Sequence, residues 1–174
     1  MRLQLVMQKP PFKEDNMKIA LLFALLCTLP AQAQSLTSTE SRMVIAVNKY
    51  RSNHNKEPLT IDPILMRVAR AAAPYYSHQI NGKWCWTRCH EAGFSGWATD
   101  NIANGYLSPE DCIGDDHSGW GNEHGVGHNL QMLGKFKMNG QWCDYKFNRI
   151  GVACSGKKWI AVFGRVDNET KEIK

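Results

Sequence analysis

Apolar residues recur at helical spacing soon after residue 36. The sequence Thr37-Ser38-Thr39-Glu40 has the S/T-x-x-E form of a capping box, in which side chains satisfy the first free N–H groups of a helix. After it, one helical face is apolar and consists of Met43, Val44, Val47 and Tyr50. This pattern predicts a first helix over about residues 38–53.

A second amphipathic helix is predicted from Asp62-Pro63. An aspartate can cap the helix, and a proline at the first helical position gives up no hydrogen bond. Pro74 ends or kinks this helix. Its apolar stripe consists of Leu65, Val68, Ala69 and Ala72.

The pattern changes towards the carboxyl end of the chain. Residues 149–154 alternate with a period of two, and the apolar run 159–164 follows a turn at 155–158. These features predict a hairpin of two central strands. The glycine-, tryptophan- and cysteine-rich segment 81–100 is predicted to be an ordered loop, as is Trp120–Asn129, which reads WGNEHGVGHN.

The first 33 residues are predicted to be a leader rather than part of the domain. From Met17, a possible translation start, Lys18 precedes an apolar run that ends before Pro30 and the small-x-small sequence at 31–33. The apolar run is shorter than the roughly 20 residues that span a bilayer, so we predict a signal peptide over 17–33. The expected localisation is secreted or periplasmic, with no stable membrane span after cleavage. A single domain is then expected over 34–174, with its core at about 40–165.

Charge and cysteine content narrow the function classes. The predicted mature chain has 17 Lys and Arg against 14 Asp and Glu, a dispersed net charge of +3 that does not suggest a nucleic-acid partner. Its five cysteines, in an exported chain, are first interpreted as disulfides. Cys85 with Cys89 and Cys143 with Cys154 are the predicted bridges, although spacing alone does not fix the connectivity and the odd cysteine has no assigned partner.

Polar motifs in a fixed order connect these elements. They are Cys89-His90-Glu91, the run 100–106 (DNIANGY), Trp120-Gly121-Asn122-Glu123, and the run 127–133 (GHNLQML). Together with the Asn48–His54 segment, they resemble the CAP superfamily, whose SCP-like members include cysteine-rich secretory proteins, venom allergens and pathogenesis-related proteins. The resemblance implies an α+β fold, a three-layer α-β-α sandwich that is loop-rich and disulfide-bonded. The sequence resembles a divergent, bacterial-style member of this superfamily.

The resemblance also implies a cleft lined by two histidines and two acidic residues. By position, the histidines are His90 and His128, and the acids are Asp100 and Glu123. Asp100 stands where the family has glutamate, which withdraws the carboxylate by roughly 1 Å. Two neutral imidazoles suit Zn²⁺ or another divalent cation, with the carboxylates orienting the rings or completing the shell through water. The same groups are also compatible with a hydrogen-bond network that holds no ligand.

Three function classes remain open on the sequence. The favoured one is an exported domain whose cleft binds a metal and a small ligand or partner, extracellular or periplasmic, without catalysis of its own. The second is a metal-assisted hydrolase or protease in which His90 and His128 hold the metal and Glu123 is the general base. The third is a sterol or lipid binder that uses the tryptophan-rich middle of the chain. His54, His78, His117 and His124 are interpreted as surface residues.

Overall fold

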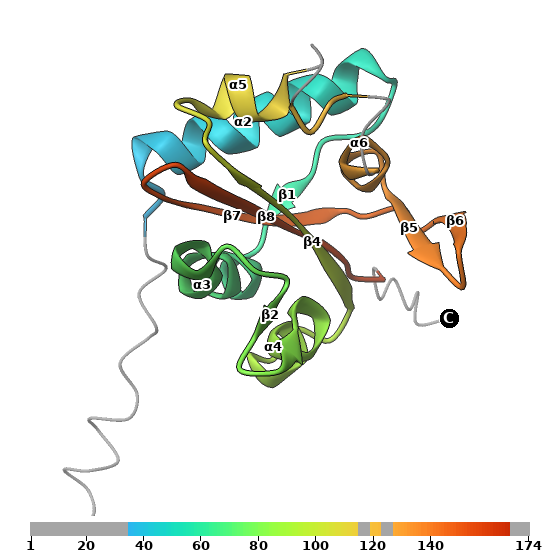
Figure 1. Ribbon diagram of the computed structural model, residues 1–174. Helices are drawn as coiled ribbons and strands as arrows, with labels where there is room; N and C mark the ends of the chain where they lie inside the picture. Colours follow the sequence, from blue (N-terminus) through green and yellow to red (C-terminus); the bar gives the residue numbers. More distant parts are fainter. Residues whose placement is uncertain (1–34, 115–118, 123–126, 168–174) are drawn as a thin grey trace, which may run out of the picture. The chain divides into compact units, whose positions relative to one another are not determined.

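The computed structural model describes residues 35–114, 119–122 and 127–167, which form one body of three layers (Figure 1). The middle layer is a four-stranded sheet in the order β1-β7-β8-β4. Its strands are β1 (Thr60–Ile61), β4 (Trp97–Asn104), β7 (Arg149–Ser155) and β8 (Lys158–Arg165). Helices cover both faces, so the α+β prediction of an α-β-α sandwich is confirmed. The predicted hairpin of central strands is confirmed as β7 and β8, which pair antiparallel.

The two predicted amino-terminal helices are present and begin where their caps were predicted. Helix α2 (Ser38–Asn53) has the complete capping box between Thr37 and Glu40, and α3 (Pro63–Ala72) is capped by the Asp62 carboxylate. The chain continues from α3 into the 3₁₀ turn η1 (Ala73–Tyr75), which contains Pro74. Both helices therefore start by a local mechanism that needs no tertiary contact.

Alternation along β7 and β8 divides the core into two parts. Ile150, Val152 and Phe163 pack with the apolar face of α2, whereas Ala153, Ile160 and Val162 pack with the stripe of α3. Successive side chains of a strand point to opposite faces, so these two strands supply apolar groups to both helix layers. This explains why the run 159–164 is continuously apolar.

The prediction of a loop over 81–100 is wrong. This segment begins in a short hairpin of β2 (Gln79–Ile80) and β3 (Lys83–Trp84), continues as helix α4 (Cys85–Glu91), and ends inside β4. The buried thiols of Cys85 and Cys89 attach α4 beneath the sheet, in the same apolar cluster as α3. Tertiary burial of this short helix outweighs the loop-like composition of the segment.

The remaining elements are two short helices and a two-stranded hairpin. Helix α5 (Pro109–Ile113) packs on α2, and helix α6 (His128–Met132) precedes the hairpin of β5 (Lys135–Met138) and β6 (Gln141–Asp144). The part of the predicted Trp120–Asn129 loop that the structure describes is irregular up to Gly127, after which α6 begins.

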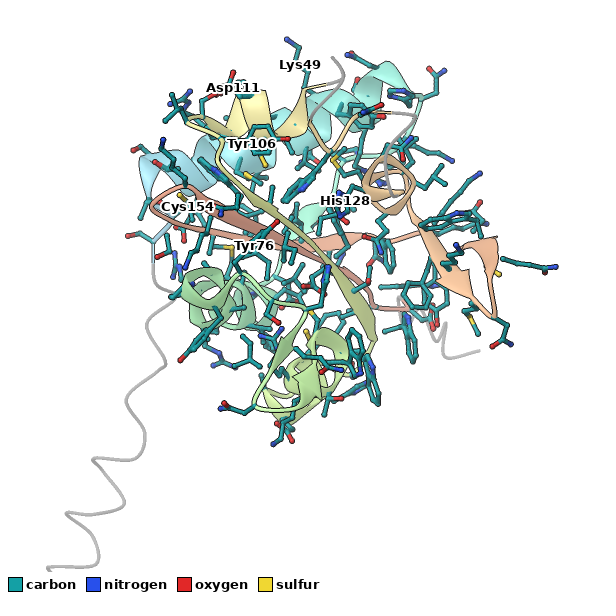
Figure 2. All side chains as sticks on the ribbon, in the orientation of Figure 1. Lys49, Tyr76, Tyr106, Asp111, His128 and Cys154 are labelled. Carbon is teal, nitrogen blue, oxygen red and sulfur yellow. The ribbon has the colours of Figure 1, made fainter. Side chains whose placement is uncertain are left out.

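The five cysteines that the structure describes are free thiols. The Sγ atoms of Cys85 and Cys89 lie 3.9 Å apart across one turn of α4, and their predicted disulfide stays a prediction. The predicted Cys143–Cys154 bridge is wrong for this fold. Cys143 is exposed on strand β6, whereas Cys154, labelled in Figure 2, lies at the opposite side of the domain. Burial raises the pKa of the Cys112 thiol in α5, and Cys154 contributes further.

Within the described ranges, no helix is long and apolar enough to cross a membrane. The predicted leader, 1–33, lies outside these residues.

Candidate functional site

A buried carboxylate in the edge strand β4 pairs with a histidine. Asp100 is 5% exposed, and its Oδ2 lies 3.1 Å from Nδ1 of His78. A carboxylate so far removed from water needs a hydrogen-bond donor or a counter-charge, and the imidazole supplies the donor. The two side chains therefore form a positioned pair rather than a chance surface contact.

The backbone brings His78 to β4 by a sharp reversal after η1. Tyr76 has φ 46° and ψ 57°, a left-handed conformation that a bulky residue rarely adopts. The next residues enter β2, whose hairpin with β3 returns the chain towards α4. Because the surrounding structure maintains this strained turn, the position of His78 is fixed by the fold.

Gly127 places the second histidine at the start of α6. Its φ is +96°, and a Cβ at this position would lie 2.2 Å from the Trp142 ring, so both conformation and space require glycine. Helix α6 is then attached to β4 by two side-chain hydrogen bonds. Asn101 Nδ2 donates to the His128 carbonyl oxygen at 3.0 Å, and Gln131 Nε2 donates to Thr99 Oγ1 at 3.3 Å. Figure 2 labels His128 on this helix, beside the sheet.

The two imidazoles have opposite electrostatic surroundings. The hydrogen bond from His78 to Asp100 raises the pKa of His78, against the opposing effect of burial. Burial is the main cause that lowers the pKa of His128, and the nearby His78 contributes further. His128 is therefore held neutral at neutral pH, which is the form that binds a metal.

A hollow of about 360 Å³ opens beside the Asp100–His78 pair. Its polar lining includes Asp100, His78, Thr99 and Gln131, and its apolar lining includes Trp84, Trp86 and Phe136. This volume falls within the roughly 300–1,000 Å³ that small-molecule pockets occupy. We refer to this hollow as the Asp100 hollow.

The predicted site residue His90 lies outside the Asp100 hollow. It is an exposed residue near the end of α4, and its ring contacts Trp86 edge-on at 6.2 Å between centroids. It lines a separate hollow with Trp97 and Tyr145. The histidine that the structure pairs with Asp100 is His78. A surface position was predicted for His78, whose side chain is 42% exposed but paired with Asp100.

Glu123, predicted as the second acid, lies outside the described residues, as do His117 and His124. Among the residues that the structure describes, no three His, Cys, Asp or Glu side chains gather closely enough to hold a metal ion. The donors that fit a divalent cation are His78, whose Asp100 partner orients the ring, and the neutral His128. Glu123 and water stay the predicted source of the remaining ligands.

We expect the two histidines to titrate on opposite sides of an ordinary imidazole, whose pKa is about 6.5. In a metal-free NMR titration of the imidazole signals, His78 should lose its proton above this value and His128 below it. The His78–Asp100 pair therefore contributes stability that is fully present below about pH 6.5 and is lost as the pH rises through the folded pKa of His78. In Asp100→Asn, the His78 midpoint should fall, and an unchanged midpoint would contradict the pairing.

The comparisons agree with this fold. The model of the cysteine-rich secretory protein family, CAP, matches residues 44–160. These residues include the second half of α2, all of α3, the strand that carries Asp100, and His128. This match covers more than half of the chain. The chain belongs to the cysteine-rich secretory protein family.

Solved structures of bacterial proteins share the fold. An outer surface protein of Borrelia burgdorferi is 17% identical with a TM-score of 0.58, over 75% of this chain and 97% of its own. An extracellular protein of Bacillus anthracis that contains an SCP domain is 22% identical with a TM-score of 0.60, over 91% of this chain. A cysteine-rich secretory protein of Staphylococcus aureus is 13% identical with a TM-score of 0.56, over 74%. This chain spans 45% and 38% of the latter two. No curated protein matched.

Proposed function

We propose that this protein is an exported CAP-type binding domain whose cleft, built on His78, Asp100 and His128, binds a divalent cation and a ligand without catalysis of its own. The observation that carries the proposal is the 3.1 Å contact between Asp100 and His78, beside a His128 whose pKa is lowered by burial. Two structural neighbours are an outer surface protein and an extracellular protein, which supports export of this chain.

The chemistry of these groups suits a borderline-soft cation such as Zn²⁺. When a carboxylate accepts the Nδ1–H of a histidine, it fixes the tautomer and leaves Nε2 with a lone pair for a metal. Asp100 has this relation to His78 through one oxygen. His128 needs no such partner to stay neutral, because burial already disfavours its charged form. Zinc sites generally take three or four ligands, which leaves one or two places for Glu123 and water.

Zinc titration into the metal-stripped chain tests the proposal. We expect binding by the unmodified protein, and loss of this binding in both His78→Ala and His128→Ala, because each removes one of two nitrogen ligands. Asp100→Asn should weaken binding by about 10- to 100-fold, the usual effect of losing a carboxylate that orients a ligand. Calorimetry measures all three variants directly.

His90→Ala is the matched control. This exposed histidine on α4 lines the other hollow, so its removal should leave zinc affinity unchanged. If His90→Ala abolished binding while His78→Ala did not, the site would be the one that the sequence resemblance implies, and our proposal of His78 as a ligand would be wrong. If the unmodified chain bound no zinc, the cation part of the proposal would be wrong.

The hydrolase and lipid alternatives stay predictions. The hydrolase requires Glu123 as a base beside the metal, and this residue is outside the described ranges. The lipid binder fits the Asp100 hollow less well, because a buried carboxylate and the side-chain amide of Gln131 line it. Polar groups of this kind lose their hydration without compensation when an acyl chain covers them.

A further inference from the structure

We propose that the cleft takes a neutral oligosaccharide, stacked on the exposed indoles of Trp84 and Trp86. This inference rests on the proposed binding function and names the chemical class of its ligand. The side chains of Trp84 and Trp86 are 50% and 43% exposed, and both line the Asp100 hollow. Large aromatic groups are costly to leave in water, and two of them beside a polar hollow indicate a binding surface.

Trp86 is held as a rigid platform. Its ring is stacked on Trp97 with an interplanar angle of 9° and 6.0 Å between centroids. Trp97 in turn packs against Phe136 and Tyr145, and this aromatic run continues through Phe147 to the fully buried Phe163. A side chain already fixed in this way loses little conformational entropy when a ligand covers it. The platform is therefore preorganised for stacking.

Two hollows adjoin this indole stack. Trp86 lines the Asp100 hollow, and Trp97, its stacking partner, lines the second hollow of about 560 Å³ that also contains His90. Two hollows that meet at a pair of stacked rings suit an extended ligand made of successive rings rather than a single compact molecule. The second hollow gives His90 a role in ligand contact that is separate from the metal site.

The polar lining favours an uncharged, hydroxyl-rich ligand. In the Asp100 hollow, Oε1 of Gln131 is buried without a hydrogen-bond partner among the described residues, and Asp100 is a further acceptor. In the second hollow, Arg165 and Asp167 form an ion pair at 2.7 Å, which leaves the Asp144 carboxylate as an acceptor for hydroxyl groups. A pyranose presents C–H groups to an electron-rich indole face and directs hydroxyl donors outwards to amide and carboxylate oxygens.

An extended peptide fits less well. Peptides commonly bind by adding a strand to an open sheet edge. Strand β4 is an edge of the sheet, but Ala98, Thr99, Asp100 and Asn101 are all buried beneath the elements that cover it. The recognition surface is then made of side chains and aromatic faces rather than of free backbone groups.

The test uses the full chain, labelled for NMR of the indole N–H groups, and three neutral probes: cellohexaose, chitohexaose and maltohexaose. We expect at least one to bind with a Kd below about 1 mM and to shift the signals of Trp84 and Trp86. Trp84→Ala and Trp86→Ala should each weaken binding by about fivefold or more in calorimetry, corresponding to a lost stacking contact. Trp84 does not belong to the aromatic run, so Trp84→Ala keeps the test valid if Trp86→Ala fails to fold.

Ile45→Ala is the control, because Ile45 is an apolar residue of α2 that is 65% exposed and lies outside both hollows. It should leave saccharide binding unchanged. No indole shift with any probe at about 10 mM would overturn the proposal. So would equal affinity in the tryptophan variants, or the same shifts produced by an uncharged hexapeptide while the saccharides produce none.

The same titrations separate this inference from the metal site. They are repeated with a chelator and in His128→Ala. Saccharide binding that persists there would show that the saccharide binds without the cation. Saccharide binding by an unmodified chain that binds no zinc would refute the cation proposal and support the oligosaccharide. If Trp84→Ala still binds zinc but no longer binds the saccharide, the result would support both the cation proposal and the oligosaccharide proposal.

Discussion

Arg51→Met is expected to lower the free energy of unfolding by about 3 kcal/mol, because it removes a charged donor from three carbonyl groups, two of them in buried hydrogen bonds. Arg51 is 4% exposed. Its guanidinium donates to the carbonyl oxygens of Glu57, at 2.8 Å, of Met132 and of Phe147. These acceptors come from the segment after α2, the end of α6 and the segment before β7, so one side chain joins three parts of the chain.

Burial lowers the pKa of Arg51, which shows that the fold bears a cost for holding the charge there. Methionine keeps much of the aliphatic stem but supplies no donor, so the three carbonyl groups lose their partner. Urea unfolding followed by circular dichroism measures the difference.

Arg42→Met is the matched control. Arg42 pairs with Glu110 at 2.5 Å, but both side chains are more than half exposed. Surface ion pairs contribute at most about 1 kcal/mol, so this variant should unfold close to the unmodified chain. Equal losses in the two variants would mean that burial of the Arg51 network is not what stabilises the domain.

Gly151→Ala should lower the free energy of unfolding by about 3 kcal/mol or more, since the added methyl group has no room. A Cβ on Gly151 would lie 2.1 Å from the Leu65 carbonyl carbon and 2.4 Å from the Met66 nitrogen. Both atoms belong to the backbone of α3 and do not move aside as a flexible side chain does. Helix α3 must shift away from β7, which opens the apolar contact between α3 and the sheet.

Gly156→Ala separates this clash from ordinary glycine effects. Gly156 has φ +61° in the β7–β8 turn, and an added Cβ meets nothing within 4 Å. The expected cost is the left-handed backbone alone, about 1 kcal/mol. Thermal or urea unfolding of the two variants should therefore differ clearly. A loss of only about 1 kcal/mol in Gly151→Ala would show that α3 does not lie as close to β7 as the structure has it.

The sequence predicted the elements whose signals are local. The capping box at Thr37–Glu40 and the Asp62-Pro63 start define α2 and α3 without reference to the rest of the fold. The β7–β8 hairpin was predicted because a strand buried on both faces is continuously apolar. Gly151 allows helix α3 to lie close against strand β7. The residues next to Gly151 in the sequence do not reveal this use of a glycine.

Two hairpins were missed although local signals mark them. Asn81-Gly82 joins β2 to β3, and Asn139-Gly140 joins β5 to β6, with positive φ at both residues of each pair. An Asn-Gly pair is the strongest short sequence signal for such a turn. The short helix α4 has no comparable signal, because Trp84 caps it without a side-chain hydrogen bond.

The sequence does not reveal which histidine pairs with Asp100. The resemblance implies His90, whereas the structure pairs Asp100 with His78, and both histidines are in segments with equally polar neighbours. The roles of His128 and Glu123 stay predictions. What distinguishes His78 from His90 is that the turn at Tyr76 directs His78 to β4, whereas His90 is near the end of α4. No periodicity in the sequence reports this, because the contact joins residues 22 positions apart through the fold.

The place of β7 and β8 in the sheet also constrains the order in which the chain can fold. Both central strands come from residues 149–165, and β1 pairs with β7 in parallel across a long sequence separation. Helices α2 and α3 are synthesised before the apolar strands against which they pack. Non-local pairing of this kind delays folding. A nascent chain therefore cannot complete this core until residues 149–165 have been made.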